Sequence, residues 1–194
     1  KGLGVCAQDP TVVFGAVEEG WIVRSRDGGS TWVTIKQGTE FDSHYVTVLP
    51  HDPSIVLATS GMGTYRSTDG GDSFLQVTSG LDRRYFAAPV VHPARPHVVF
   101  TAAAAVPPPM WRSRPEGADT GFYRSDDYGE TWMSLTNGLP DYFTAAPRFA
   151  GGDPTDPNVF MVGMTNGEVW SSNDGGESFQ LLLGGLPSVS GVSV

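Results

Sequence analysis

The sequence predicts an all-β fold made of four similar units, and three observations support this prediction. One eight-residue stretch occurs four times along the chain. No stretch shows sustained helical periodicity. Turn-forming residues are abundant, with 25 glycines and 15 prolines among 194 residues. Repeats at regular spacing define an architecture in which each unit packs on its neighbours.

The repeated stretch, which we call the box turn, follows the pattern Ser-x-Asp-x-Gly-x-Thr/Ser-Trp/Phe. We expect its Asp to accept hydrogen bonds from backbone N–H groups a few residues later. The Gly supplies the positive φ that a tight reversal needs, and the Ser/Thr hydroxyl bonds back across the turn. The final ring is expected to be buried at the start of the next strand. The predicted structural residues are Asp27, Gly29, Trp32, Asp69, Gly71, Phe74, Asp127, Gly129, Trp132, Asp174, Gly176 and Phe179.

The spacing of the box turns predicts a β-propeller. Asp27, Asp69, Asp127 and Asp174 follow one another at intervals of 42, 58 and 47 residues. These intervals fit blades of about 40–50 residues, with one long insertion in the third repeat. We therefore interpret residues 1–194 as one domain or partial propeller. Its repeats cover approximately residues 1–40, 41–82, 83–140 and 141–187, and residues 188–194 start another blade.

Each repeat has the same order of elements. A first strand is followed by an Asp-Pro or His-Pro turn, a second strand, a short hairpin, a third strand, the box turn and a brief outer strand. Asn166-Gly167 is the strongest hairpin signal in the chain. The predicted first strands are residues 3–7, 45–49, 86–91 and 143–149, and the predicted second strands are 11–16, 55–59, 97–102 and 159–163.

The two ends of the sequence suggest that the propeller continues. Residues 3–7 already supply a first strand, and residues 190–194 align with the beginning of another one. A closed ring of four blades would not need that strand twice. We therefore expect part of a larger propeller, cut inside a fifth repeat. Four blades closing alone, or two copies completing one ring, are the alternatives. An open arc would expose two apolar blade faces.

Composition argues against several classes of general partner. The net charge of −9 and a pI near 4.7 argue against nucleic acid and anionic membranes, which both attract basic surfaces. No apolar run approaches the length of a membrane span. Cys6 is the only cysteine, so an internal disulfide is excluded and a buried, small apolar role is expected. No cofactor is expected. No leader peptide is visible, although the chain begins at Lys1 rather than Met.

The box turns resemble the Asp-box (BNR) repeat, which in that family lies between the third and fourth strands of a propeller blade. The resemblance covers nearly the whole chain. It implies a β-propeller of four-stranded antiparallel blades, with about four blades present. The family includes sialidases, xyloglucan-cleaving hydrolases, sortilin-like sorting receptors and photosystem II assembly factors, so the resemblance implies no single activity. An extracytoplasmic or secreted location is slightly favoured.

The propeller arrangement divides the polar residues between two faces. Box turns and Asp-Pro turns share one face, and the opposite face, which we call the loop face, carries ligands in the resembling families. The insertion at residues 103–121 belongs to the loop face, and its three consecutive prolines stiffen it. The predicted ligand-binding residues are Trp111, Arg112, Arg114, Arg83, Arg84, Tyr85, Tyr142 and His44.

These candidates have alternative structural roles. Aromatic planes beside guanidinium groups suit sugar rings, carboxylates or a peptide. Trp111 would instead pack inward if the insertion only covers its own blade, and the repeated aromatics would pack between blades. His44 is a candidate general base, although a histidine in a turn is more often neither a catalyst nor a ligand. No metal site is expected, because the other three histidines have no metal-ligand spacing and the box turns lack a calcium-loop pattern.

Two functions are consistent with the sequence. The first is a non-catalytic propeller that binds a protein or carbohydrate ligand on its loop face. The second is a glycoside hydrolase, or part of one. The sialidase-like branch implies an arginine cluster and a Tyr–Glu pair, but its usual Arg-Ile-Pro segment is absent. The xyloglucanase-like branch implies paired aspartates across a cleft between two propellers. Half of such a pair would come from Asp42, Asp82, Asp119 or Asp141.

Overall fold

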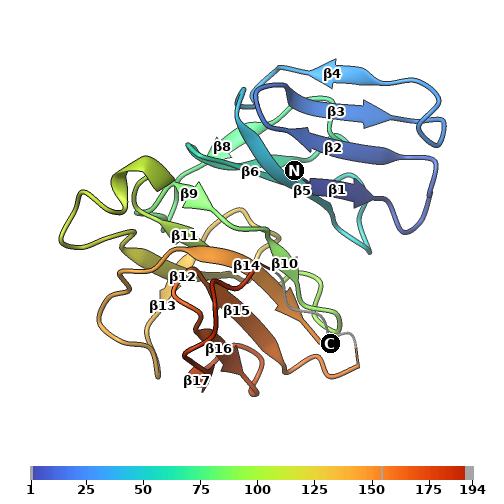
Figure 1. Cartoon of the computed structure of the whole chain (residues 1–194). Coiled ribbons are helices and arrows are strands. Elements are labelled where there is room, and N and C mark those ends of the chain that lie inside the picture. Colours follow the sequence, from blue (N-terminus) through green and yellow to red (C-terminus); the bar gives the residue numbers. More distant parts are fainter. Residues whose placement is uncertain (1, 154, 191–194) are drawn as a thin grey trace.

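The computed structural model describes residues 2–153 and 155–190. It confirms the predicted all-β fold: four antiparallel sheets follow one another as propeller blades (Figure 1). At the junctions between consecutive blades, β1 (Gly2–Val5) contacts β5 (Ser43–Val48), β6 (Val56–Ser60) contacts β9 (Tyr85–Phe86), and β11 (Val99–Ala104) contacts β14 (Pro147–Gly152). Within the described residues, no helix has the length and apolar character needed to span a bilayer.

The first two blades are regular four-stranded meanders, in which each strand pairs with its neighbour in the sequence. The strands of the first blade are β1 (Gly2–Val5), β2 (Val13–Val17), β3 (Trp21–Ser25) and β4 (Val33–Ile35). Those of the second blade are β5 (Ser43–Val48), β6 (Val56–Ser60), β7 (Gly63–Ser67) and β8 (Leu75–Val77).

The third blade differs from its prediction in the inner strand. The single strand predicted over residues 86–91 is split into β9 and β10, which both pair with β11. Pro89 lies in the gap and has no N–H to donate to a ladder. The insertion after β11 contains one turn of 3-10 helix, η1 (Pro108–Met110). The strands are β9 (Tyr85–Phe86), β10 (Val90–Val91), β11 (Val99–Ala104), β12 (Thr120–Ser125) and β13 (Met133–Leu135).

The fourth blade begins later than predicted. Its inner strand was expected from residue 143, but Phe143 forms only an isolated bridge with Thr120 and stacks on Phe122 of the third blade. Packing against the neighbouring blade therefore takes this residue out of the sheet. The additional strand predicted at residues 190–194 lies, beyond Ser190, outside the described residues. The strands are β14 (Pro147–Gly152), β15 (Phe160–Met164), β16 (Val169–Ser172) and β17 (Gln180–Leu183).

The box turns have the hydrogen bonds expected from the sequence. The Asp69 carboxylate accepts bonds from the backbone N–H of Ser73 at 3.0 Å and from its hydroxyl at 2.6 Å. The Ser67 hydroxyl donates to the same carboxylate at 2.7 Å and accepts from the Gly71 N–H at 2.9 Å. Gly71 has a φ of 79°. The other three box turns repeat this pattern, so the recurring Asp is a structural residue that fixes the bend.

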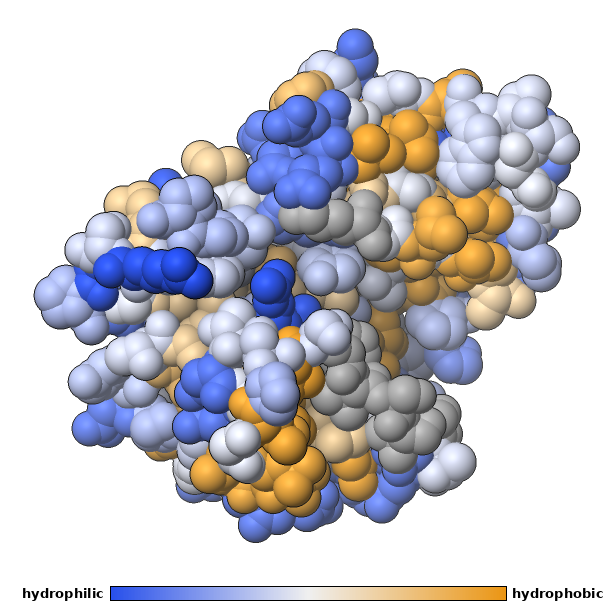
Figure 2. All heavy atoms as spheres, viewed as in Figure 1, coloured by the Kyte–Doolittle hydropathy of each residue, from blue (hydrophilic) through white to orange (hydrophobic). Residues whose placement is uncertain are grey.

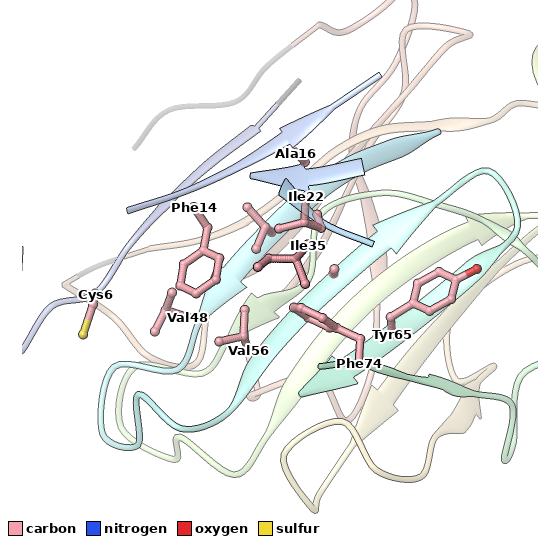
Figure 3. Close-up of a cluster of buried hydrophobic side chains, with 11 residues drawn as sticks. Cys6, Phe14, Ala16, Ile22, Ile35, Val48, Val56, Tyr65 and Phe74 are labelled. Carbon is pink, nitrogen blue, oxygen red and sulfur yellow. The ribbon is translucent and has the colours of Figure 1, made fainter. Parts of the chain in front are cut away.

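Most box-turn rings are buried against the preceding blade. Phe74 packs into the cluster between the first and second blades (Figure 3) and is 2% exposed. Trp132 and Phe179 occupy the same place at the next two junctions. The predicted burial is wrong for Trp32, which is 44% exposed. The reason is its position in the first blade, because no earlier blade covers it within the described residues.

Apolar side chains remain exposed on the first and fourth blades. Leu3 and Val5 of β1 are exposed on the first blade, and Leu181 to Leu183 of β17 are exposed on the fourth. Figure 2 shows hydrophobic surface over the first blade and over the region of β16 and β17. The outer strands of the second and third blades also carry exposed apolar side chains, Leu75 and Met133.

Candidate functional site

A small pocket lies on the loop face, where inner strands of the second, third and fourth blades approach each other. Its volume is about 110 Å³. Side chains from β5, β9 and β14 contribute to it, together with one residue of the insertion. The lining residues are His44, Tyr45, Tyr85, Phe86, Ala87, Trp111, Pro147 and Arg148. Three of the residues predicted from the sequence therefore come together here: His44, Tyr85 and Trp111.

Two polar residues of the pocket occupy β-bulges in inner strands. The pairing of β5 with β6 shifts register around His44, and the pairing of β14 with β15 shifts around Arg148. Bulges re-aim side chains and are common beside functional sites. Arg148 is not among the residues predicted from the sequence. A signal exists, however, because His44 and Arg148 each lie nine residues before the proline of their turn, Pro53 and Pro157.

Aromatic rings form one wall of the pocket. The Tyr85 ring meets the Trp111 ring edge to face, with centroids 5.8 Å apart, and contacts the His44 ring at 4.8 Å. The Trp111 indole N–H donates to the carbonyl oxygen of Val106 at 2.7 Å. Because Val106 also belongs to the insertion, this bond closes the insertion on itself. Trp111 is partly buried against the cluster of Ala104, Ala118 and Ala146, and its ring also lines the pocket. The inward packing considered for Trp111 is therefore observed, and ligand binding by its ring stays a prediction.

Arg83 belongs to a structural network rather than to the pocket lining. Its guanidinium lies 2.7 Å from the Asp82 carboxylate and 2.9 Å from that of Asp119, and its Nε donates to the Asp119 carbonyl oxygen at 2.8 Å. The Tyr123 hydroxyl donates to Asp82. Burial, followed by the bond to Asp82, raises the pKa of Tyr123 well above its usual range. This network fixes the point where the insertion returns to β12.

The remaining candidates lie apart from the pocket. Arg84 and Arg112 are exposed, and Arg114 pairs with Glu116 at 3.6 Å. Tyr142 is 62% exposed and lines a separate hollow beside the hairpin between β15 and β16. These residues therefore lie at separate positions on the surface and do not form one site together.

Next to the pocket, two carboxylates approach a buried imidazole. Glu18 lies in the turn between β2 and β3, Asp42 precedes β5, and His44 is within β5. Their ligand atoms all lie within 4.8 Å of one another. The Asp42 Oδ1 to His44 Nε2 distance is 3.2 Å. The sequence places each residue on the loop face, but their proximity depends on how the first blade packs on β5.

The architecture defines this chain as a β-propeller with a pocket at the inner ends of its blades, and similar proteins have the same fold. No family model matches the chain. A "Probable oligoxyloglucan-reducing end-specific xyloglucanase" from Neosartorya fischeri is 29% identical over 168 residues, which cover 77% of this chain and 19% of that protein. The chain thus spans about a fifth of the length of this curated relative.

Solved structures agree with the fold. The Niastella koreensis GH74 enzyme superimposes with a TM-score of 0.75 at 18% identity, covering 94% of this chain and 29% of that one. The GH74 xyloglucanase from Xanthomonas campestris gives a TM-score of 0.72 at 15% identity, covering 93% and 29%. At these identities the similarity establishes the β-propeller fold, and the chain corresponds to only part of each enzyme.

Proposed function

We propose that this chain binds a xyloglucan-type oligosaccharide on its loop face, as one section of a larger propeller protein. The relative from Neosartorya fischeri is named for xyloglucan, and its similarity extends over most of this chain. The net charge of −9 favours a neutral glycan over an anionic one, because an acidic surface repels anions at long range.

The observation that supports this proposal most directly is the composition of the pocket. Tyr85 and Trp111 supply apolar ring surface, and Arg148 and His44 supply polar groups beside it. Carbohydrate sites combine these two features, because sugars present both C–H faces and hydroxyl groups. The pocket volume of about 110 Å³ is below the roughly 300–1,000 Å³ of typical small-molecule sites. The pocket would therefore receive one part of the ligand, with the remainder lying across the exposed face.

Calorimetric titration with xyloglucan oligosaccharides, cello-oligosaccharides and a sialylated oligosaccharide tests this proposal. We expect saturable binding of the xyloglucan oligosaccharide, weakened at least tenfold in Trp111→Ala and in Arg148→Ala. Trp32→Ala is the matched control, because it removes an exposed tryptophan from a box turn. Equal binding in all three variants, or a preference for the sialylated sugar, would contradict the proposal.

Glycoside hydrolysis is a second candidate, and one observation favours it. A carboxylate oxygen of Glu18 and one of Asp42 lie within 4.8 Å of each other. The two catalytic carboxyl groups of retaining glycosidases are separated by a similar distance of about 5–5.5 Å. Asp82 and Asp119, by contrast, pair with Arg83. A panel of fluorogenic glycosides provides the test. Hydrolysis requires turnover that is abolished in Asp42→Asn and retained in Asp141→Asn, an exposed aspartate outside the cluster. Absence of turnover leaves carbohydrate binding as the function.

A further inference from the structure

We infer that Glu18, Asp42 and His44 form a binding site for one divalent cation of the Zn²⁺ or Mn²⁺ kind. This inference goes beyond the proposed carbohydrate binding and does not depend on it. The three residues come from two neighbouring blades, and their ligand atoms converge on the loop face.

The distances among the ligand atoms suit a metal centre. Bonds of about 2.0–2.2 Å to a central ion place adjacent ligand atoms about 3 Å apart and opposite ones about 4 Å apart. The 3.2 Å separation of Asp42 Oδ1 and His44 Nε2 matches an adjacent pair. All three ligand atoms lie within 4.8 Å, so a small rotation of the exposed Glu18 side chain would complete the set.

The backbone that carries these ligands is held in place by hydrogen bonds. The N–H groups of Gly20 and Trp21 both donate to the carbonyl oxygen of Phe41, at 2.9 and 3.1 Å. These bonds tie the turn that carries Glu18 to the segment that carries Asp42. The rings of Trp21 and Phe41 also contact each other, with centroids 4.6 Å apart. Ligands on fixed backbone bind with little ordering cost, which favours a preorganised site.

The His44 imidazole is the ligand with the most fixed orientation, and it determines which metals the site prefers. The side chain is 2% exposed, and its ring packs against Tyr85, so the imidazole has little rotational freedom. An imidazole with two carboxylates suits Zn²⁺ or Mn²⁺, whereas Ca²⁺ and Mg²⁺ prefer oxygen ligands alone. Because three protein ligands do not fill the coordination sphere, the positions beside exposed Glu18 and half-exposed Asp42 are open to water or a sugar hydroxyl.

The same three groups have one alternative arrangement. A protonated His44 between two carboxylates would form an ion triad without a metal. A metal site and an ion triad respond differently to added cations, because only the former has a saturable affinity that depends on the identity of the metal.

The test is calorimetric titration of the chelator-treated, dialysed chain with ZnCl₂, MnCl₂ and CaCl₂. We expect one equivalent of Zn²⁺ or Mn²⁺ to bind more tightly than Ca²⁺ and to raise the Tm. Binding should weaken at least tenfold in Glu18→Gln and in Asp42→Asn. The matched control is Glu19→Gln, which removes the same charge one residue away in the same turn and should bind as the wild type does.

A second readout tests His44 without replacing this buried residue. Its imidazole ¹⁵N resonances should shift on addition of Zn²⁺ and stay unchanged in the Glu18→Gln variant at the same metal concentration. Three results would overturn the inference: no saturable binding, equal affinity in Glu18→Gln and wild type, or unshifted His44 resonances. A Tm that does not change on addition of Zn²⁺ or Mn²⁺ would also overturn it.

Discussion

A Cβ atom placed on Gly80 would lie 1.6 Å from the carbonyl oxygen of Trp132, which belongs to the box turn of the next blade. The Gly38–Phe74 and Gly138–Phe179 pairs repeat this relationship at the other two junctions, at 1.6 and 2.0 Å. Beside each glycine, the box-turn ring residue also donates its backbone N–H to the preceding blade. Each blade junction therefore requires a glycine where the outer strand of the preceding blade ends.

Gly80→Ala should destabilise the fold much more than Gly185→Ala. The two glycines have almost the same φ, 77° and 75°, so both alanines carry a left-handed strain of about 1–2 kcal/mol. Only Gly80→Ala would also clash with backbone, since among the described residues no neighbouring atom lies within 4 Å of a Cβ on Gly185. Urea denaturation at equilibrium measures the difference. Equal midpoints for the two variants would contradict this description of the junction.

Trp132→Ala should cost far more stability than Trp32→Ala, although both residues end a box turn. Trp132 is 6% exposed and packs between the second and third blades, whereas Trp32 is 44% exposed. Truncating a buried tryptophan costs about 3–5 kcal/mol, and surface substitutions usually change stability by about 0.5 kcal/mol or less. Guanidinium denaturation monitored by circular dichroism gives both values. A large loss in Trp32→Ala would mean that Trp32 is covered in solution.

The fold was predictable because the box turn is local. Its hydrogen bonds join residues four or fewer positions apart, so the pattern of Ser67, Asp69, Gly71 and Ser73 contains the whole turn. Strand boundaries were less predictable, because they depend on contacts between blades. Phe143 illustrates this dependence. The sequence predicts a strand that begins at Phe143, but stacking of its ring on Phe122 removes the residue from the sheet.

The box-turn aspartates should make the protein sensitive to acid but not to mildly acidic pH. The hydroxyl and N–H of Thr31 lower the pKa of Asp27 to about 2, and bonds from the Ser178 hydroxyl and N–H lower that of Asp174 to about 2. An unfolded Asp has a pKa of about 3.9. A lowered pKa stabilises the fold above the unfolded value, and this stabilisation is lost as the pH falls toward the folded value.

The contribution of these aspartates to the urea midpoint should therefore stay level from pH 7 to about 5 and decrease between about pH 4 and 2. Asp174→Asn should lower the midpoint at neutral pH and make its decrease in acid less steep. A midpoint that does not decrease between about pH 4 and 2 would argue against the aspartates as a source of acid sensitivity.

Arg83→Gln should loosen the insertion, whereas Arg84→Gln should not. Arg83 binds both the carboxylate and the carbonyl oxygen of Asp119, and the neighbouring Arg84 side chain is exposed. Losing bonds to a charged partner costs about 1.5–3 kcal/mol each when the groups are buried, and less here because Arg83 is partly exposed. Hydrogen exchange of residues 105–119 should accelerate in Arg83→Gln alone. Equal exchange in both variants would show that the network does not hold the insertion.

The candidate site was predictable only in part. His44, Tyr85 and Trp111 stand out as aromatic or titratable residues on loop-face segments, and they do meet in one pocket. Arg148 lies within a predicted strand, and the signal for it is its spacing of nine residues from Pro157, which matches that of His44 from Pro53. The register shift at Arg148 is seen in the pairing of β14 with β15. The approach of Glu18 to Asp42 likewise depends on packing between blades.

The most direct test of carbohydrate binding on the loop face uses the indole N–H resonances of the five tryptophans. Titration with a xyloglucan oligosaccharide should shift the Trp111 resonance progressively to saturation and leave the Trp32 resonance, on the box-turn side, unchanged. Shifts at Trp32 without shifts at Trp111, or no shift at any tryptophan up to millimolar oligosaccharide, would contradict the proposed site.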